Sequence, residues 1–274
     1  MSYKSILLNV DIDGTIGPIV KIAVDLARRS EARLIGFCAA DAPMPVTMAP
    51  EGAAIAADIW QQSRDDIQKR FRELNAEFDS LVAGSVAAEW RDVHGNPNHA
   101  LVATSRMADL IITGASQGAS TGDPYRSVDP GSLALHAGRP LLIAAGGAQN
   151  MPAGRIVVAW KDTREARRAV ADAVPLMVMA NEVIVVTVDP EPSDRSRAGV
   201  KDVATFLSRH AITARTEVLK ADDECDKLID FLSSANADLI VSGAYGHSRI
   251  SEWVFGGVTR SLLDETRICR FMSY

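Results

Sequence analysis

The sequence has few cysteines and no long hydrophobic stretch, and each lack excludes a class of protein. Its three cysteines, Cys38, Cys225 and Cys269, stand far apart, so they make neither a disulfide framework nor a cysteine-rich zinc site. No apolar run reaches the ~18 residues of a membrane span, and the first residues lack the layout of a signal peptide. These absences predict a cytoplasmic protein that does not bind a membrane.

The motifs of several enzyme classes are missing as well. There is no Gly-x4-Gly-Lys-[Ser/Thr] phosphate loop, no Gly-x-Gly-x-x-Gly after a first strand, no Gly-x-Ser-x-Gly nucleophile elbow and no His-Glu-x-x-His. Lysine and arginine number 29 against 35 acidic residues, and the net charge of −6 argues against nucleic acid as a partner. Since no residue stands out as a general base, we do not predict catalysis.

What the chain does contain is an internal repeat at about half its length. Residues 6–10 read like residues 156–160, and residues 108–114 read like residues 237–243, in the same order along the chain. The segment 145–154 between the copies is rich in glycine and turn formers, as a short linker should be. The sequence therefore predicts two domains, residues 1–148 and residues 149–274.

Each copy alternates short apolar runs with amphipathic stretches. Several runs are continuous rather than alternating, which is typical of parallel strands covered on both faces. Helices lie between the runs, among them a long one over 51–79, a shorter counterpart near 198–209, and one that Asp162 or Thr163 caps. The pattern predicts two doubly wound α/β domains, with strands near 4–10, 32–39, 85–91, 108–114 and 140–145, and near 155–160, 182–188, 212–218, 237–243 and 267–272.

A glycine loop follows the fourth strand of the second copy. Gly243, Gly246, Gly256 and Gly257 make the pattern Gly-x2-Gly-x9-Gly-Gly, which runs into a helical stretch. Glycines let the backbone approach a ligand closely, and a helix N-terminus favours an anion. Nearby positive charge comes from His247, Arg249 and Arg260. In doubly wound sheets ligands bind beyond the carboxyl ends of the strands, so the loop predicts a phosphate site there.

The block Ala-Asp-Leu-Ile-Val-Ser-Gly-Ala-Tyr-Gly-His-Ser-Arg, together with the loop spacing and the duplication, resembles the universal stress protein family in its tandem form. The resemblance implies a Rossmann-like fold of the adenine nucleotide alpha hydrolase type. Each domain would hold a five-stranded parallel sheet, and a pseudo-twofold axis would relate the two. It also implies ATP, with Mg²⁺, as the ligand of the second copy. The candidate contacts are Ala159, Lys161, Val188, Ser242, Gly243, Tyr245, Gly246, Arg249, Gly256, Gly257 and Val258.

Both copies depart from the family pattern. Gly257 stands where nucleotide binders carry serine or threonine, and Lys161 stands where the family has an aspartate. Lys161 cannot accept the hydrogen bond of an aspartate; it would either meet a phosphate or obstruct the base. The first copy keeps Asp11, but its loop is longer and holds Asp123 and Asp129, which would repel phosphate. We therefore expect nucleotide binding in the second copy and not in the first.

Three functions stay open on these residues. The favoured one is a regulatory module of the stress response that binds an adenine nucleotide. The second is a scaffold with vestigial crevices, whose long first-copy helix recruits a protein partner. A slow ATP hydrolase is the least favoured. An edge strand also offers a contact for a homodimer, because unpaired strand edges invite partners.

Smaller features have two interpretations each. Trp160 and Trp253 could stack on a base, but we favour packing in a core or an interface. His94 and His99 could hold a metal, but we favour a solvated loop that leads into a helix. The acidic run over 222–226 is interpreted as charge at a helix start.

Overall fold

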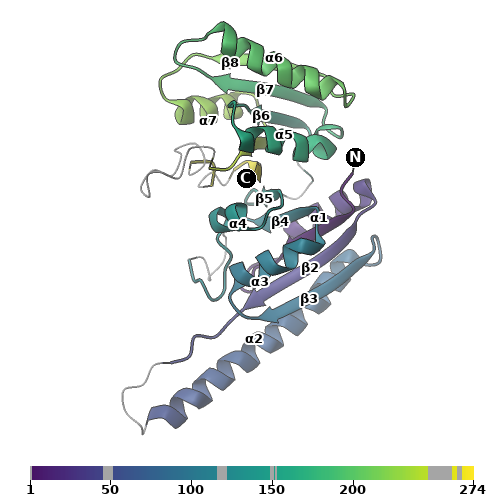
Figure 1. Ribbon diagram of the computed structural model, residues 1–274. Coiled ribbons are helices and arrows are strands. Elements are labelled where there is room, and N and C mark those ends of the chain that lie inside the picture. The colour runs from purple at the N-terminus through teal and green to yellow at the C-terminus, as the bar shows by residue number, and fades with distance from the viewer. Residues whose placement is uncertain are drawn as a thin grey trace.

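Strands and helices alternate along the whole chain (Figure 1). The computed structural model describes residues 2–45, 52–115, 122–148, 151, 153–245, 261–263 and 267–274. The N-terminal half contains β1 (Ser5–Asn9), α1 (Gly17–Ser30), β2 (Arg33–Ala40), α2 (Ala53–Val82), β3 (Ala88–His94), α3 (Pro97–Thr104), η2 (Ser105–Met107), β4 (Leu110–Gly114), α4 (Pro130–His136) and β5 (Leu141–Ala144). The C-terminal half contains β6 (Arg155–Ala159), α5 (Arg164–Met177), β7 (Glu182–Val188), α6 (Asp194–Ser208), β8 (Ala214–Leu219), α7 (Glu224–Ser234), β9 (Leu239–Gly243) and β10 (Cys269–Ser273).

All of these strands belong to one sheet. The strand order is β3-β2-β1-β4-β5-β10-β9-β6-β7-β8 in a ten-stranded sheet. Within each half, all neighbouring strands are parallel, so the doubly wound α/β class and the five parallel strands per half are confirmed. The exception is the pair β5–β10, which is antiparallel and joins the halves. The order of the strands mirrors itself about this pair, as a twofold relation between the halves requires.

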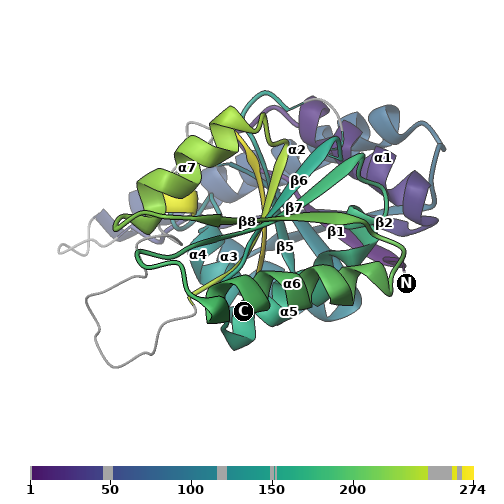
Figure 2. The ribbon, with the colours of Figure 1, turned by 90° about the horizontal axis from the view of Figure 1, so that it is seen from above.

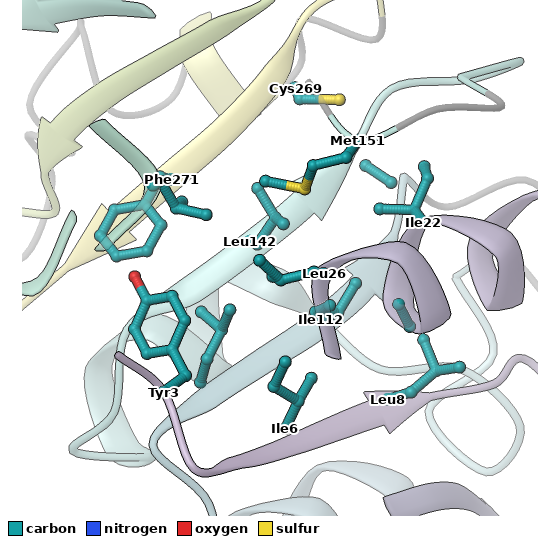
Figure 3. Close-up of a cluster of buried hydrophobic side chains, with 14 of the residues drawn as sticks. Tyr3, Ile6, Leu8, Ile22, Leu26, Ile112, Leu142, Met151, Cys269 and Phe271 are labelled. Atoms are coloured by element: carbon teal, nitrogen blue, oxygen red, sulfur yellow. The ribbon is translucent and has the colours of Figure 1, made fainter. Parts of the chain in front are cut away.

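The junction between the halves is a buried hydrophobic contact. Phe271 of β10 pairs with Leu142 of β5, and Figure 3 shows both side chains in one cluster with Tyr3. The Tyr3 hydroxyl donates a hydrogen bond to the Asp172 carbonyl of α5 (2.7 Å). Ser273 Oγ of β10 donates to Asp172 Oδ2 (3.0 Å). The chain thus builds one continuous core across the β5–β10 pair, which the repeat alone did not predict.

Helices cover both faces of the sheet. Figure 2 shows α5 and α6 on one side of β7 and β8 and α7 on the other. On the α1/α2/α5/α6 face, a single hydrophobic cluster extends through both halves. On the opposite face the core divides into a cluster under α3 and α4 and a cluster under α7. The carboxyl ends of the strands, where the residues described below lie, therefore adjoin both kinds of core.

Local capping sets the helix boundaries. Thr163 caps α5 as predicted, since its Oγ1 accepts a hydrogen bond from Ala166 N (3.2 Å). The start of α6 lies earlier than the predicted 198, because Ser193 forms a capping box with Ser196. The start of β3 lies three residues later than predicted, because α2 continues to Val82 and a turn follows it. None of the helices in the described ranges has the length and apolar character that a membrane crossing requires.

Candidate functional site

The sheet has two topological switch points, one in each half. Strand order reverses between β1 and β4 in the N-terminal half and between β6 and β9 in the C-terminal half. In such sheets a crevice forms beyond the carboxyl ends of the two strands, where successive helices leave on opposite faces. The two switch points can therefore be compared position by position.

Four of the predicted residues gather on one face of the C-terminal switch point. Ala159 ends β6 and Val188 ends β7, and both pack against the cluster under α7. Ser242 of β9 lies two residues after Ile240, a member of the same cluster, so it points to that face too. Lys161 follows β6 by two residues. The other residues of the predicted loop, Gly246, Arg249, Gly256, Gly257 and Val258, lie outside the described residues, as does Trp253.

Ser242 has an unsatisfied hydroxyl at this switch point. Its side chain is buried, with 5% of the residue exposed, and its Oγ has no hydrogen-bond partner among the described residues. Buried polar groups in folded proteins are nearly always paired, with protein or with ordered water or a ligand. An unpaired hydroxyl beside the small side chain of Ala159 therefore fits a polar ligand.

Lys161 is held in an ion pair with the start of α7. Its Nζ donates to both carboxylate oxygens of Glu224, at 2.9 Å and 2.8 Å. Glu224 is the first residue of α7, where Asp223 caps the helix by accepting from Cys225 N (2.8 Å). The acidic run is thus a helix start, as interpreted from the sequence, and its carboxylate also engages Lys161.

Gly243 has a packing role in the fold. A Cβ added there would lie 2.5 Å from Ala166 N and 2.7 Å from the carbonyl carbon of Glu165, both in the backbone of α5. The first turn of α5 therefore rests directly on the end of β9, and only glycine leaves room for it. At Gly114, the corresponding residue of the N-terminal half, an added Cβ would meet only the Ile19 Cδ1 atom at 3.7 Å.

Tyr245 reaches from the C-terminal half into the N-terminal half. It has a left-handed backbone (φ 56°), and its ring packs against the cluster under α3 and α4. A Cβ added at Gly131 would lie 2.6 Å from the Tyr245 hydroxyl, so the ring ends at the start of α4. Burial and the nearby Asp129 carboxylate raise the pKa of Tyr245. The structure thus places this predicted contact residue at the joint between the halves.

The N-terminal switch point has different polar residues, and they are paired with each other. Asn9 Nδ2 donates a hydrogen bond to Thr113 Oγ1 (3.1 Å), and both residues are buried. These are the positions that Ala159 and Ser242 occupy in the other half. Beyond the pair lies a small cleft of about 100 Å³, lined by Asn9, Asp11, Gly14, Thr15, Ile16, Pro18, Ile19, Thr113, Gly114, Ala115, Ser127, Val128 and residues 144–148.

Two acidic residues of this half are held by partners of their own. Asp129 caps α4, with its carboxylate accepting from Gly131 N (3.0 Å) and Ser132 N (3.2 Å). Asp13 forms a two-pronged ion pair with Arg126, at 2.8 Å and 2.6 Å. The free N–H groups of a helix start are what would attract an anion, and here the protein's own carboxylate already takes them.

The remaining predicted residues lie away from both crevices. Trp160 is partly buried on the opposite face of the sheet, where it packs against the core and lies beside Gly199 of α6. His94 ends β3 and its Nε2 lies 2.8 Å from Gln68 Oε1, while the backbone N–H of His99 donates to the cap residue Asn96 (3.1 Å). Within the described residues no group of three or more metal-binding side chains occurs.

Sequence reasoning missed two partners. Glu224 received a role only as helix-start charge, and Asn9 received none. The sequence did contain a signal for Asn9, because the repeat aligns Asn9 with Ala159 and Thr113 with Ser242. The N-terminal half has two polar residues at these positions, whereas the C-terminal half has one polar residue and an alanine. The pairing of Lys161 with Glu224 had no such signal, since the two residues are far apart in the chain and meet only through the fold.

No protein-family model and no curated protein matches the sequence. Among solved structures, a universal stress protein from Archaeoglobus fulgidus DSM 4304 is similar over 98% of this chain and 95% of that chain, with a TM-score of 0.77 and 13% identity. A functionally unknown protein from Pseudomonas aeruginosa PAO1 is similar over 99% and 92%, with a TM-score of 0.61 and 16% identity. A candidate universal stress protein from Pseudomonas aeruginosa UCBPP-PA14 is similar over 99% and 93%, with a TM-score of 0.59 and 17% identity.

These comparisons define the class of the fold. The chain is a duplicated, doubly wound α/β protein whose two halves share one sheet. More particularly, it has the fold of the tandem universal stress proteins, since the match to the Archaeoglobus protein extends over both halves.

Proposed function

We propose that this chain works as a universal stress protein, a regulatory module that binds an adenine nucleotide through its C-terminal half. The observation that carries the proposal is the buried, unpartnered Ser242 hydroxyl at the switch point between β6 and β9. It lies directly before the glycine loop, whose Gly-x2-Gly-x9-Gly-Gly pattern suits a phosphate chain.

The N-terminal half supports the proposal by contrast. At its switch point Asn9 and Thr113 are hydrogen-bonded to each other, and Asp129 occupies the start of α4. A phosphate there would have to displace a carboxylate from its backbone partners. We therefore assign one nucleotide to each chain, with Mg²⁺ bound to the phosphates in the usual way of ATP.

Calorimetric titration of the purified, nucleotide-free chain with Mg-ATP tests this function, with ADP, AMP and GTP beside it. We expect one site per chain that prefers the adenine nucleotide. A ligand at 100 times its dissociation constant stabilises the folded state by about 2.7 kcal/mol, so melting should shift upward by several degrees. Two equal sites per chain would contradict the assignment to the C-terminal half.

The variant Gly246→Val should abolish binding by crowding the loop where the backbone meets the phosphates. Its matched control is Gly118→Val, which changes a glycine in the loop of the N-terminal half and should leave binding intact. Gly243 is unsuited to this test, because a side chain there would strike the backbone of α5. If Gly118→Val abolishes binding and Gly246→Val does not, the halves have been assigned the wrong way round.

One observation favours a second function, that of a scaffold for a protein partner. The first turns of α2 extend away from the body of the N-terminal half (Figure 1), and Ile55 and Ile59 are 65% and 54% exposed. Exposed aliphatic side chains four residues apart on a helix make a contact surface. If the titration finds no nucleotide of any kind, this scaffold function replaces the nucleotide module.

A further inference from the structure

The Lys161–Glu224 ion pair joins the segment after β6 to the start of α7 at the C-terminal switch point. Lys161 stands just beyond β6, and Glu224 opens α7, the helix that covers this face of the sheet. The pair is partly open to water, with the Lys161 side chain 48% and the Glu224 side chain 34% exposed. It is therefore a contact that a ligand can reach and that solvent already weakens.

Glu224 is also surrounded by charge of its own sign. Asp222, Asp223 and Asp226 lie within two residues of it. Asp223 is committed to the cap of α7, where it accepts from Cys225 N and Asp226 N. Lys161 thus neutralises part of the negative charge at the start of α7. While its ammonium group is bound to the Glu224 carboxylate, it is not available to another anion.

We propose that this ion pair is a latch that competes with an anionic ligand for Lys161. The inference rests on the proposed function, since the ligand is the phosphate chain of the nucleotide. In the latched state, without a ligand, Lys161 is ion-paired with Glu224. When the nucleotide binds, Lys161 exchanges the carboxylate for a phosphate oxygen, and the first turn of α7 is released. The latch thereby couples occupation of the crevice to the position of α7.

The latch makes a specific thermodynamic prediction. If the charge of Glu224 is removed, Lys161 is free before the nucleotide binds. The free energy of binding then no longer includes the cost of breaking the ion pair. Because exposed ion pairs are weak, we expect Glu224→Gln to raise the affinity for ATP only about threefold. Adenosine, which carries no phosphate, should bind Glu224→Gln and the unaltered chain equally well.

A double-mutant cycle on the full chain tests the latch. Dissociation constants for Mg-ATP and for adenosine are measured for the unaltered chain, Glu224→Gln, Lys161→Met and the double variant. Lys161→Met should weaken ATP binding and should abolish the effect of Glu224→Gln. The matched control is Asp222→Asn, which removes the same charge two residues away and should raise ATP affinity less than Glu224→Gln does. Melting temperatures confirm that α7 stays folded.

The outcomes separate the latch from the nucleotide site. If the unaltered chain binds ATP and Glu224→Gln changes nothing, the latch is wrong and the site stands. If Glu224→Gln acts equally with Met at position 161, or no more strongly than Asp222→Asn, the effect is general charge repulsion and the latch is again wrong. If neither the unaltered chain nor Glu224→Gln binds a nucleotide, the proposed function fails and the latch fails with it.

Discussion

The N-terminal and C-terminal switch points occupy equivalent places in the sheet but hold different chemistry. In the N-terminal half, Asn9 and Thr113 satisfy each other through a buried hydrogen bond. In the C-terminal half, Ala159 cannot do this for Ser242, whose hydroxyl has no partner in the described part of the chain. The first switch point pairs its buried polar groups with each other, whereas the second leaves a polar group that a ligand could satisfy.

The two halves also differ in the ion pairs near their switch points. In the N-terminal half, Arg126 holds Asp13 in an ion pair that fixes the acidic side chain. In the C-terminal half, Lys161 holds Glu224 in a partly exposed ion pair beyond the end of β6, which is expected to be weak. The two halves of one repeat thus hold their charged side chains at the switch points in different pairs.

The largest contrast that a single substitution should expose is between Gly243 and Gly114. Gly243→Ala places a methyl group within 2.5 Å of the α5 backbone, whereas Gly114→Ala meets one side-chain atom at 3.7 Å. Overpacking against a backbone that cannot move costs about 3 kcal/mol. We therefore expect Gly243→Ala to lower the free energy of unfolding by that amount and Gly114→Ala to change it little, as measured by urea denaturation.

Two results of this experiment would contradict the contrast between Gly243 and Gly114. Equal losses in the two variants would mean that α1 approaches β4 as closely as α5 approaches β9. A tolerated Gly243→Ala would mean that the start of α5 can shift, and the glycine would then be explained by the ligand loop rather than by packing.

Removing the hydroxyl at each switch point should change the free energy of unfolding by different amounts, and this difference should be smaller than that between the two glycines. Thr113→Val keeps the shape of the side chain but leaves the buried Asn9 amide without its acceptor, at a cost of about 1.5 kcal/mol. Ser242→Ala removes a hydroxyl that has no partner among the described residues, so it should be neutral or slightly stabilising. Thermal unfolding of the nucleotide-free protein measures both.

Ligand binding sharpens this second contrast. Ser242→Ala should weaken the binding of Mg-ATP, and Thr113→Val should not, because only the C-terminal hydroxyl faces the proposed ligand. A destabilising Ser242→Ala without ligand would show that an ordered water already satisfies the hydroxyl.

Much of this architecture was predictable because it depends on local patterns. Continuous apolar runs gave the strands to within a few residues, since a strand buried on both faces must be apolar throughout. Thr163 and Asp223 cap helices as their residue types indicate. The repeat gave two matching halves, because equal patterns fold into equal units.

The joint between the halves was not predictable from these patterns. The antiparallel pairing of β5 with β10 depends on which edge of each half is exposed, and no local pattern contains that information. The same limit applies to Tyr245, which the loop motif presents as a ligand contact and which in the structure reaches the start of α4. It applies also to Glu224, whose partner Lys161 is distant in the chain. Contacts between elements, unlike the elements themselves, arise only in the assembled sheet.

The smallest expected contrast concerns pH. The third strand ends at His94 in the N-terminal half and at Leu219 in the C-terminal half. Burial lowers the pKa of His94 below its ordinary value of 6.5, and the positive charge of Arg64 lowers it further, against the opposing charges of Asp92 and Asp41. The unfolded chain therefore takes up a proton at a higher pH than the folded chain does, so stability is complete above pH 6.5 and falls as the pH drops through the lowered pKa.

We expect His94→Gln to flatten the decline of the melting temperature below pH 6.5, because glutamine does not titrate there. Glutamine also keeps a polar group that can pair with Gln68, the present partner of His94. The matched control is His210→Gln in the C-terminal half, where the imidazole packs at a tilt against the Phe206 ring, with the ring centroids 4.8 Å apart. If His210→Gln flattens the profile as much as His94→Gln does, then the pH response belongs to both halves and the asymmetry between their third strands has no thermodynamic consequence.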